Sequence, residues 1–193
     1  MNLLIKNGRV VHPVTGAVLL QDIYLEDGKI ALLDRGLEVA ADRTIDAKEL
    51  VVCPGLVDMH VHLRDPGLTY KEDICTGTAA AARGGVTSLA CMANTDPVVD
   101  CPEQVAYVKE RAKEGSGTRV FPIAAVSKGL RGQELTDAEA LKAAGAIALS
   151  DDGCNVDNAN LMRDALIMAN RLEMPILCHC EDTSMVAGRA VNE

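Results

Sequence analysis

The chain has 193 residues, of which 48% are hydrophobic and 24% are charged, so it can bury a core and is not a disordered polymer. A formal charge of −9 and an aromatic content of 2% exclude a nucleic-acid-binding surface, which needs basic groups and stacking rings. No apolar run approaches the roughly 20 residues of a membrane helix, and MNLLIKNG is too short for a secretory signal, so we expect a cytoplasmic protein without membrane or nucleic-acid partners.

Residues 1–52 are expected to form a small β-sandwich portion. Three stretches carry alternating or β-branched apolar residues between turn residues: NLLIKNGRVVHP, QDIYLEDGKIALLD and RTIDAKELVVCPG. The dipeptides Asn7-Gly8 and Asp27-Gly28 are typical of two-residue hairpin turns, so a hairpin is predicted at each of them.

Residues 53–193 have a different rhythm, in which short apolar runs alternate with helical patterns. Strands are predicted at 55–62, 86–92, 118–126, 146–150 and 175–179, and helices at 72–83, 102–114, 137–144 and 158–171. This alternation is typical of a parallel sheet covered by helices. These elements would suffice for an open doubly wound sheet, whereas a complete (β/α)8 barrel usually needs about 250 residues.

Two histidines, His60 and His62, stand two residues apart in GLVDMHVHLRDPG, at the end of the first of these strands. Residues two apart face the same side of a strand, so both imidazoles and Asp58 are expected to line one face. They can share a metal ion only if that face looks into a cavity, such as the mouth of a parallel barrel. The alternative is two half-buried histidines, each bonded to a backbone carbonyl.

Further candidate ligands follow the fourth and fifth strands. ALSDDG places Asp151 and Asp152 directly after the fourth strand, and ILCHCED places His179 at the end of the fifth. Imidazoles together with a carboxylate suit zinc or a similar divalent ion. Taken alone, Asp-Asp-Gly is more typical of a turn, so its metal-binding interpretation depends on the histidines.

The cysteines and His12 are interpreted as structural or surface residues. The seven cysteines are scattered and lack CxxC spacing, so we expect them to be reduced and mostly buried. Strand alternation is expected to turn Cys178 and Cys180 away from the face of His179 and into packing. His12 precedes a proline and is expected at the surface.

Four stretches together resemble the amidohydrolase superfamily, most closely the bacterial type I dihydroorotases: PGLVDMHVHLRDPG, GGVTSLACMANTDP, ALSDDG and LCHCED. The resemblance implies an α/β fold, a (β/α)8 TIM-type barrel that is incomplete here, with a small β-sandwich. It also implies an enzyme with one or two zinc ions that reversibly cyclises N-carbamoyl-L-aspartate to L-dihydroorotate in pyrimidine synthesis.

The resemblance also implies roles for individual residues. The implied metal ligands are His60, His62, Asp152 and His179. The first two would bind one zinc ion, Asp152 would bridge to a second ion, and His179 would bind that second ion. Asp152 is preferred over its neighbour because its 27-residue spacing to His179 matches the family pattern. Arg64 and Asn94 would bind the substrate carboxylate.

Members of this family continue through three more barrel strands, which carry another metal-binding histidine and the aspartate that shuttles the proton. Neither has a counterpart in these 193 residues, so the catalytic aspartate is expected beyond residue 193. We therefore expect this chain to be the N-terminal part of such an enzyme and to be inactive, or nearly so, by itself.

Two alternatives stay open. Related hydantoinases and allantoinases often use a carboxylated lysine as the bridge, and the absence of lysine after Lys142 disfavours them. A non-catalytic scaffold for aspartate transcarbamoylase would be expected to lose ligands, whereas all four are present here. Besides the small-molecule substrate, a second copy of the chain or aspartate transcarbamoylase are the possible partners, and the number of zinc ions is not fixed by the residues.

Overall fold

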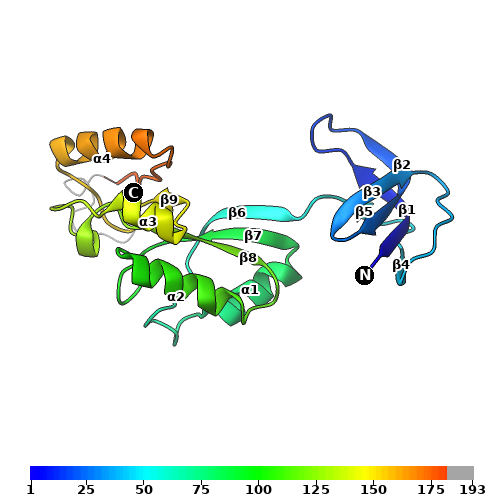
Figure 1. The fold of residues 1–193 in the computed structure, drawn as a ribbon, viewed down its shortest axis with the longest axis horizontal. Coiled ribbons are helices and arrows are strands. Elements are labelled where there is room, and N and C mark those ends of the chain that lie inside the picture. The colour runs from blue at the N-terminus through cyan, green and yellow to red at the C-terminus, as the bar shows by residue number, and fades with distance from the viewer. Residues whose placement is uncertain (182–193) are drawn as a thin grey trace, which may run out of the picture. The chain divides into compact units, whose positions relative to one another are not determined.

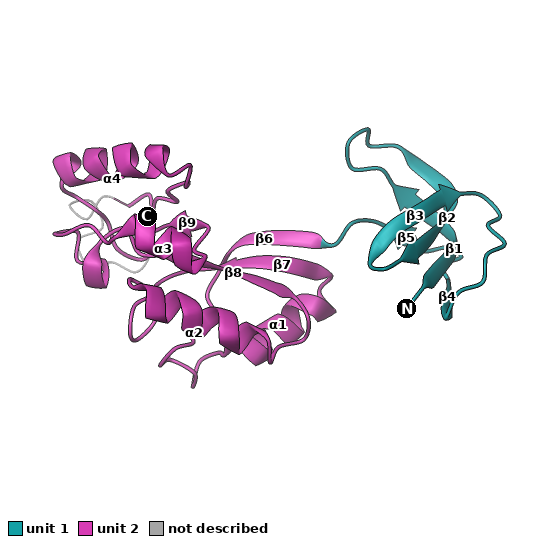
Figure 2. Ribbon diagram, viewed as in Figure 1, with its two compact units in different colours: residues 1–55 teal, residues 56–193 magenta. Residues whose placement is uncertain are grey.

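The computed structural model describes residues 1–181 of the chain (Figure 1). It divides into two compact units, the first spanning Met1–Gly55 and the second beginning at Leu56 (Figure 2). Each unit has its own sheet, so each is described by itself. Within the described residues, none of the helices combines the length and apolar character needed to cross a lipid bilayer.

Unit 1 is a single five-stranded sheet. Its strands are β1 (Leu3–Val11), β2 (Val18–Glu26), β3 (Lys29–Asp34), β4 (Arg43–Asp46) and β5 (Val51–Val52). The order is β3-β2-β1-β4, with β5 also paired to β1. Because β1 pairs antiparallel with β2 and parallel with β4 and β5, it is the strand on which the unit is built.

Only one of the two predicted hairpin dipeptides forms a hairpin. Asp27 and Gly28 have φ values of 49° and 74° and connect β2 to β3, as predicted. The Asn7-Gly8 hairpin is wrong, because both residues lie inside β1, where the register with β2 shifts between Ile5 and Gly8. The backbone N–H of Asn7 donates to Asp22 Oδ1 at 2.7 Å instead of closing a turn. This dipeptide therefore serves as a bulge.

Unit 2 is a parallel sheet with helices between its strands. The strands are β6 (Leu56–Val61), β7 (Val86–Cys91), β8 (Arg119–Ala124) and β9 (Ala148–Leu149), and the helices are α1 (Ile74–Arg83), α2 (Pro102–Ala112), α3 (Ala138–Ala144) and α4 (Ala159–Arg171). A short 3-10 turn, η1 (Lys128–Leu130), follows β8. The strand order β6-β7-β8-β9 follows the chain, which is the arrangement of successive strands in a (β/α)8 barrel.

The predicted fifth strand at 175–179 is reduced to a single parallel bridge. Leu149 pairs with Ile176, and two backbone bonds hold this bridge, one from Leu149 to Pro175 and one from Leu177 to Leu149. The predicted position beside β9 is therefore correct, whereas the predicted length is wrong. The segment that carries His179 lies beyond the paired residues.

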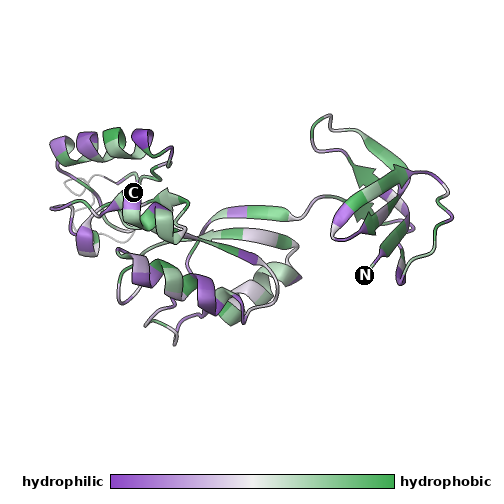
Figure 3. Ribbon diagram, in the orientation of Figure 1, coloured by the Kyte–Doolittle hydropathy of each residue, from purple (hydrophilic) through white to green (hydrophobic). Residues whose placement is uncertain are grey.

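The helix starts are set by side chains that accept hydrogen bonds from the first turn. Asp73 accepts from the backbone N–H of Thr76, whose hydroxyl reaches back to the Asp73 backbone, so α1 begins with a capping box. Asp137 and Asn158 accept in the same way at the starts of α3 and α4. Figure 3 shows hydrophilic and hydrophobic residues alternating along α2 and α4, as expected for helices with one buried face.

Strand residues of unit 2 divide between two apolar clusters. Leu89 and Cys91 of β7 pack in a large cluster with buried helix residues such as Ile74 and Val105. The residues that alternate with them belong to a small cluster made of Ala90, Met92, Ile123 and Ala148. The sheet is therefore covered by helices on one face, while its other face buries few residues in the described chain.

The loop after β6 is tied to α2 through a buried carboxylate. The Asp65 side chain is 1% exposed and accepts a hydrogen bond from the Tyr107 hydroxyl at 2.8 Å, with Arg111 Nε 3.5 Å away. This hydrogen bond to Asp65 raises the pKa of Tyr107, because it stabilises the neutral phenol that donates it. The stability that this hydrogen bond contributes is therefore present at neutral pH and is lost as the pH rises through the raised pKa of Tyr107.

Replacing Tyr107 with Phe should lower the free energy of unfolding by about 1–3 kcal/mol, because a buried carboxylate loses its neutral donor. Urea unfolding followed by circular dichroism measures this change. Tyr70→Phe is the matched control, because Tyr70 is 78% exposed and its variant should stay within about 0.5 kcal/mol of the parent. Equal midpoints for the two variants would contradict the proposed anchoring of the loop.

Candidate metal centre

The predicted metal ligands lie at or just after the carboxyl ends of strands in unit 2. His60 is the next-to-last residue of β6, and His62 directly follows that strand. Asp152 comes three residues after β9, and His179 comes three residues after the bridge at Ile176. Because parallel strands bring their carboxyl ends to one edge of a sheet, these side chains can meet despite their distance along the chain.

The carboxylate of Asp152 is the point at which these side chains meet. Its Oδ1 lies 3.4 Å from Nε2 of His60 and 3.3 Å from Nδ1 of His179, and its Oδ2 lies 3.4 Å from Nε2 of His62. Ligand atoms of His60, His62 and Asp152 all lie within 4.8 Å of one another. The two β6 imidazoles meet edge to face, with ring centroids 5.2 Å apart.

These separations fit a shared cation better than they fit hydrogen bonds. A charged N–H···O bond is about 2.7–2.9 Å long, whereas the three contacts are 3.3 to 3.4 Å. Ligand atoms bound at about 2.0–2.1 Å to a tetrahedral zinc ion stand about 3.3–3.4 Å apart. Imidazole nitrogens with a carboxylate oxygen are also donors that zinc prefers. The arrangement is therefore a candidate metal site.

Burial of the carboxylate points the same way. The Asp152 side chain is only 11% exposed, and the groups that approach it within the described residues are imidazoles rather than lysine or arginine. A buried carboxylate needs a compensating positive charge. The side chains of His60 and His179 are 49% and 34% exposed, so an ion could reach the carboxylate between them.

Asn94 fixes the protonation of His62. It comes three residues after β7, and its Oδ1 lies 2.9 Å from Nδ1 of His62. A carbonyl oxygen only accepts hydrogen bonds, so Nδ1 carries the proton and donates it. The Nε2 atom, which faces Asp152, therefore keeps its lone pair in the neutral ring.

The two adjacent aspartates do different things. Asp151 accepts hydrogen bonds from the backbone N–H groups of Val126 and Ser127, at 2.7 and 3.0 Å, and from the Ser127 hydroxyl. Its carboxylate is thus occupied by the loop after β8. Only Asp152 of this pair faces the histidines.

Arg64, the arginine predicted to bind the substrate, lies in the loop after β6. It follows His62 by two residues, adopts a left-handed φ of 58° and is half-buried. Among the described residues, none forms a hydrogen bond or ion pair with its side chain. The contact of Asn94 with His62 uses only the amide oxygen. The amide nitrogen lies near Gly153.

Asp58 does not join the cluster, although alternation placed it on the face of the histidines. The register of β6 with β7 shifts between Asp58 and Val61, so strict alternation does not hold there. Its Oδ1 accepts a hydrogen bond from the His60 backbone N–H at 3.1 Å. The surface position predicted for His12 also needs correction, because this residue is half-buried and its Nε2 donates to Gln21 Oε1 at 2.8 Å.

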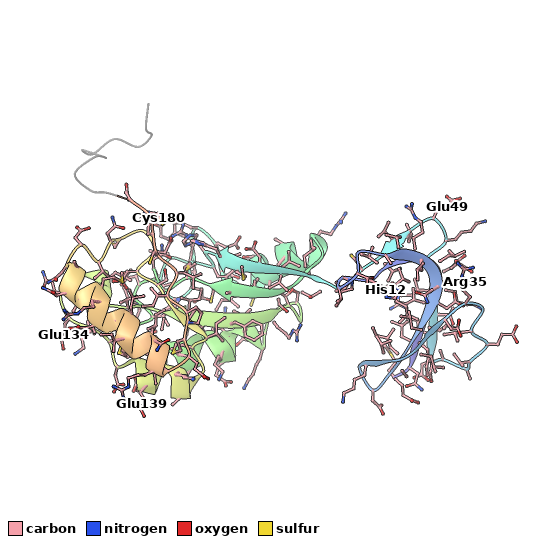
Figure 4. The ribbon with its side chains drawn as sticks, turned by 90° about the horizontal axis from the view of Figure 1, so that it is seen from above. His12, Arg35, Glu49, Glu134, Glu139 and Cys180 are labelled. Carbon is pink, nitrogen blue, oxygen red and sulfur yellow. The ribbon has the colours of Figure 1, made fainter. Side chains whose placement is uncertain are left out.

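All seven cysteines are free, as predicted, but most are not buried. Cys91 is buried, and desolvation raises its pKa to about 12. Cys178 and Cys180 are exposed, and Cys180 lies next to the end of the described chain (Figure 4). The packing role predicted for this pair is wrong, because the expected strand stops at Ile176 and covers neither thiol.

Comparison with known proteins identifies the family. A family profile described as Dihydro-orotase-like matches residues 49–193. The chain belongs to this dihydroorotase-like family. It is 50% identical over 193 residues to a dihydroorotase of Ruminiclostridium cellulolyticum and 48% identical over 194 residues to one of Geobacter sulfurreducens. Each match covers the whole chain but only 45% and 46% of these relatives, so the chain spans less than half the length of the curated relatives it matches.

Solved structures confirm the fold class. An L-hydantoinase (dihydropyrimidinase) from Arthrobacter aurescens matches with a TM-score of 0.81 at 22% identity, covering 96% of this chain and 42% of that one. A D-hydantoinase matches with a TM-score of 0.77 at 26% identity, covering 97% and 42%. The parallel sheet of unit 2 is thus a partial (β/α)8 barrel that follows an N-terminal β-sheet.

Two contacts of the site were not foreseen from the sequence. One is the bond between Asn94 and His62, and the other joins His179 Nε2 to Glu181 Oε2 at 2.9 Å. The position of Asn94 after a predicted strand is the signal that could have suggested the first, since it shares the sheet edge with His62. Nothing in the residue pattern distinguishes Glu181 from the acidic residue that follows it.

Replacing Asn94 with Ala should weaken zinc binding about 10- to 100-fold, because His62 loses the partner that fixes its tautomer. Competition with a chromophoric chelator measures this affinity in a protein of the relatives' full length. Asn160→Ala, at an exposed position of α4, is the control and should bind zinc like the parent. Equal affinities in the two variants would show that the Asn94 contact has no influence on the metal.

Proposed function

We propose that this chain is the N-terminal part of a zinc-dependent dihydroorotase, which interconverts N-carbamoyl-L-aspartate and L-dihydroorotate in pyrimidine synthesis. The observation that carries the proposal is the convergence of His60, His62 and His179 on the carboxylate of Asp152. Its support from relatives is the 50% identity to a curated dihydroorotase over the whole chain. The activity belongs to a protein of the relatives' length, of which these residues supply part of the site.

The residues fit the chemistry of opening a cyclic amide. An amide is a poor electrophile and water is a poor nucleophile, and one or two zinc ions would polarise the carbonyl and make water more acidic. His60, His62 and Asp152 would hold such an ion. Where there are two ions, His179 would bind the second. Water then adds to the ring carbonyl carbon, the C–N bond breaks, and the departing nitrogen takes up a proton.

Positioning of the substrate falls to Arg64 and Asn94. The substrate is an anion that approaches a chain with a formal charge of −9, so local positive charge must attract it. The guanidinium of Arg64, which has no side-chain partner among residues 1–181, offers a planar pair of donors that suits a carboxylate. The amide nitrogen of Asn94 adds a neutral donor while its oxygen stays with His62.

Proton transfer is assigned to a group outside these residues. Asp151 is occupied by three hydrogen bonds, and Asp152 is committed to the metal in this proposal. Within the described residues, neither acid of the pair is therefore free to carry a proton between water and the leaving nitrogen. An aspartate in the remaining part of a full-length protein would supply this step.

A hydantoinase-like activity is the second candidate, because hydantoinases match the fold with TM-scores of 0.81 and 0.77. Those matches share only 22% and 26% of residues with the chain, against 50% for a dihydroorotase. A non-catalytic scaffold for aspartate transcarbamoylase is a third, and it is disfavoured because the four predicted ligands meet. The sequence identity therefore favours dihydroorotase.

The test is metal removal and substrate preference in a full-length protein that carries these residues. We expect chelation to abolish hydrolysis of dihydroorotate and zinc to restore it, with hydantoin and allantoin hydrolysed at least about 100-fold more slowly, because the site is built for a carboxylate. Turnover that survives chelation would overturn the metal assignment. A preference for hydantoin would replace dihydroorotase by the second candidate.

Replacing Arg64 with Met should raise KM for dihydroorotate about tenfold or more, because the substrate carboxylate loses its charged partner. Steady-state kinetics of the metal-loaded enzyme measure this change. Arg163→Met is the control, because Arg163 lies on the exposed side of α4 and pairs with its neighbour Asp164. An unchanged KM in Arg64→Met would remove this residue from the substrate site.

A further inference from the structure

Ser150 and Asp151 directly precede the candidate ligand Asp152 and form a buried polar link from it to two other segments. Both are almost completely buried, with 1% and 5% exposure. Buried polar side chains are costly unless they are hydrogen-bonded, so their partners define what they do. The partner of Ser150 lies in the segment that leads to His179, and the partners of Asp151 lie in the loop after β8.

The link on one side runs to the loop after β8. Asp151 Oδ1 accepts from the backbone N–H groups of Val126 and Ser127, and Oδ2 accepts from the Ser127 hydroxyl. Ser127 is fully buried, and its hydroxyl oxygen also accepts from the Gly132 N–H at 2.8 Å. One carboxylate oxygen thus satisfies two buried backbone donors that have no strand partner at this point, and the other oxygen accepts from the hydroxyl.

The link on the other side runs to the segment of His179. The Ser150 hydroxyl donates to the Leu177 carbonyl at 2.8 Å and accepts from the backbone N–H of Asp152 at 3.1 Å. It therefore joins the backbone of one candidate ligand to the backbone two residues before another. The single bridge at Ile176 would otherwise be the main restraint on that segment.

We propose that Asp151 is a positioning residue, whose carboxylate, locked on the loop after β8, holds the carboxylate of Asp152 toward His60, His62 and His179. Ser150 completes the arrangement, because its hydroxyl binds the backbone of the His179 segment and the backbone of Asp152. This inference rests on the proposed metal centre and extends it to residues that do not touch the ion. Asp151 belongs to the binding geometry even though its own oxygens are turned away from the histidines.

The alternative is that Asp151 contributes only to folding. The two roles differ in what its removal changes. A purely structural residue would lower stability and leave the metal environment of the folded molecules unaltered, whereas a positioning residue would alter the ligand geometry itself. Affinity for cobalt and the cobalt absorption bands, which depend on ligand geometry, distinguish them.

The experiment compares Asp151→Ala, Asp151→Asn and the parent in a full-length protein titrated with cobalt alone. We expect Asp151→Ala to bind cobalt about 10- to 100-fold more weakly, with changed visible absorption bands, because a partner that orients a ligand is lost. Asp151→Asn keeps one acceptor oxygen for the two backbone N–H groups, so it should recover most of the affinity. Asp137→Ala is the matched control, since it removes the helix-capping carboxylate of α3 and should keep the parent affinity and bands.

Unchanged affinity and bands in Asp151→Ala would overturn the inference while leaving the metal centre intact. A parent protein that binds no cobalt would instead overturn the proposed function, and the inference with it. If Asp151→Ala does not fold, Ser127→Ala removes the hydroxyl that donates to Asp151, together with its bond from the Gly132 N–H, and leaves the carboxylate in place. That variant should then bind about two- to fivefold more weakly with shifted bands, and parent-like binding in it would overturn the inference.

Discussion

The carboxylate of Asp152 lies between three imidazole nitrogens at 3.3 to 3.4 Å, and most other features of unit 2 can be understood from that arrangement. A carboxylate that is 11% exposed and is approached by imidazoles in the described part of the chain needs a positive charge to offset its lost hydration. A parallel sheet supplies this geometry, because each strand delivers the residues after its carboxyl end to one edge. The loops that follow must then hold their side chains within a fraction of an ångström.

That demand explains why so many buried polar groups surround the site without joining it. Asp65 fixes the loop of Arg64 to α2, Asn94 fixes the ring of His62, and Asp151 fixes the loop that presents Asp152. Asp151 satisfies backbone donors that its neighbouring loop leaves without partners, whereas Asp65 and Asn94 each bind a side chain. In the proposed function, substrate and metal binding would thus depend on residues whose side chains hold other parts of the site in place.

Much of this could be predicted from local pattern, and the exceptions have physical causes. The strands, the helices and the ligands at strand ends follow from apolar periodicity and spacing. Asn7-Gly8 has the residues of a hairpin, yet the bond to Asp22 and the close approach of Val52 to Gly8 make it a bulge in a long strand. The Asn94 contact to His62 joins residues 32 positions apart, which no local pattern encodes. Exposure of Cys178 was missed because strand length depends on neighbours rather than on propensity alone.

The first strand of unit 2 lies at an edge of the sheet in the described residues, and Val57 and Met59 on it are 66% and 70% exposed. Such an edge presents unpaired backbone amide and carbonyl groups beside apolar side chains. It is therefore a template to which a strand of another polypeptide can add. These 193 residues expressed alone would therefore be prone to aggregate. His60 lies on the same exposed edge strand. Covering this edge with further strands would improve solubility and shelter the candidate metal ligands at the same time.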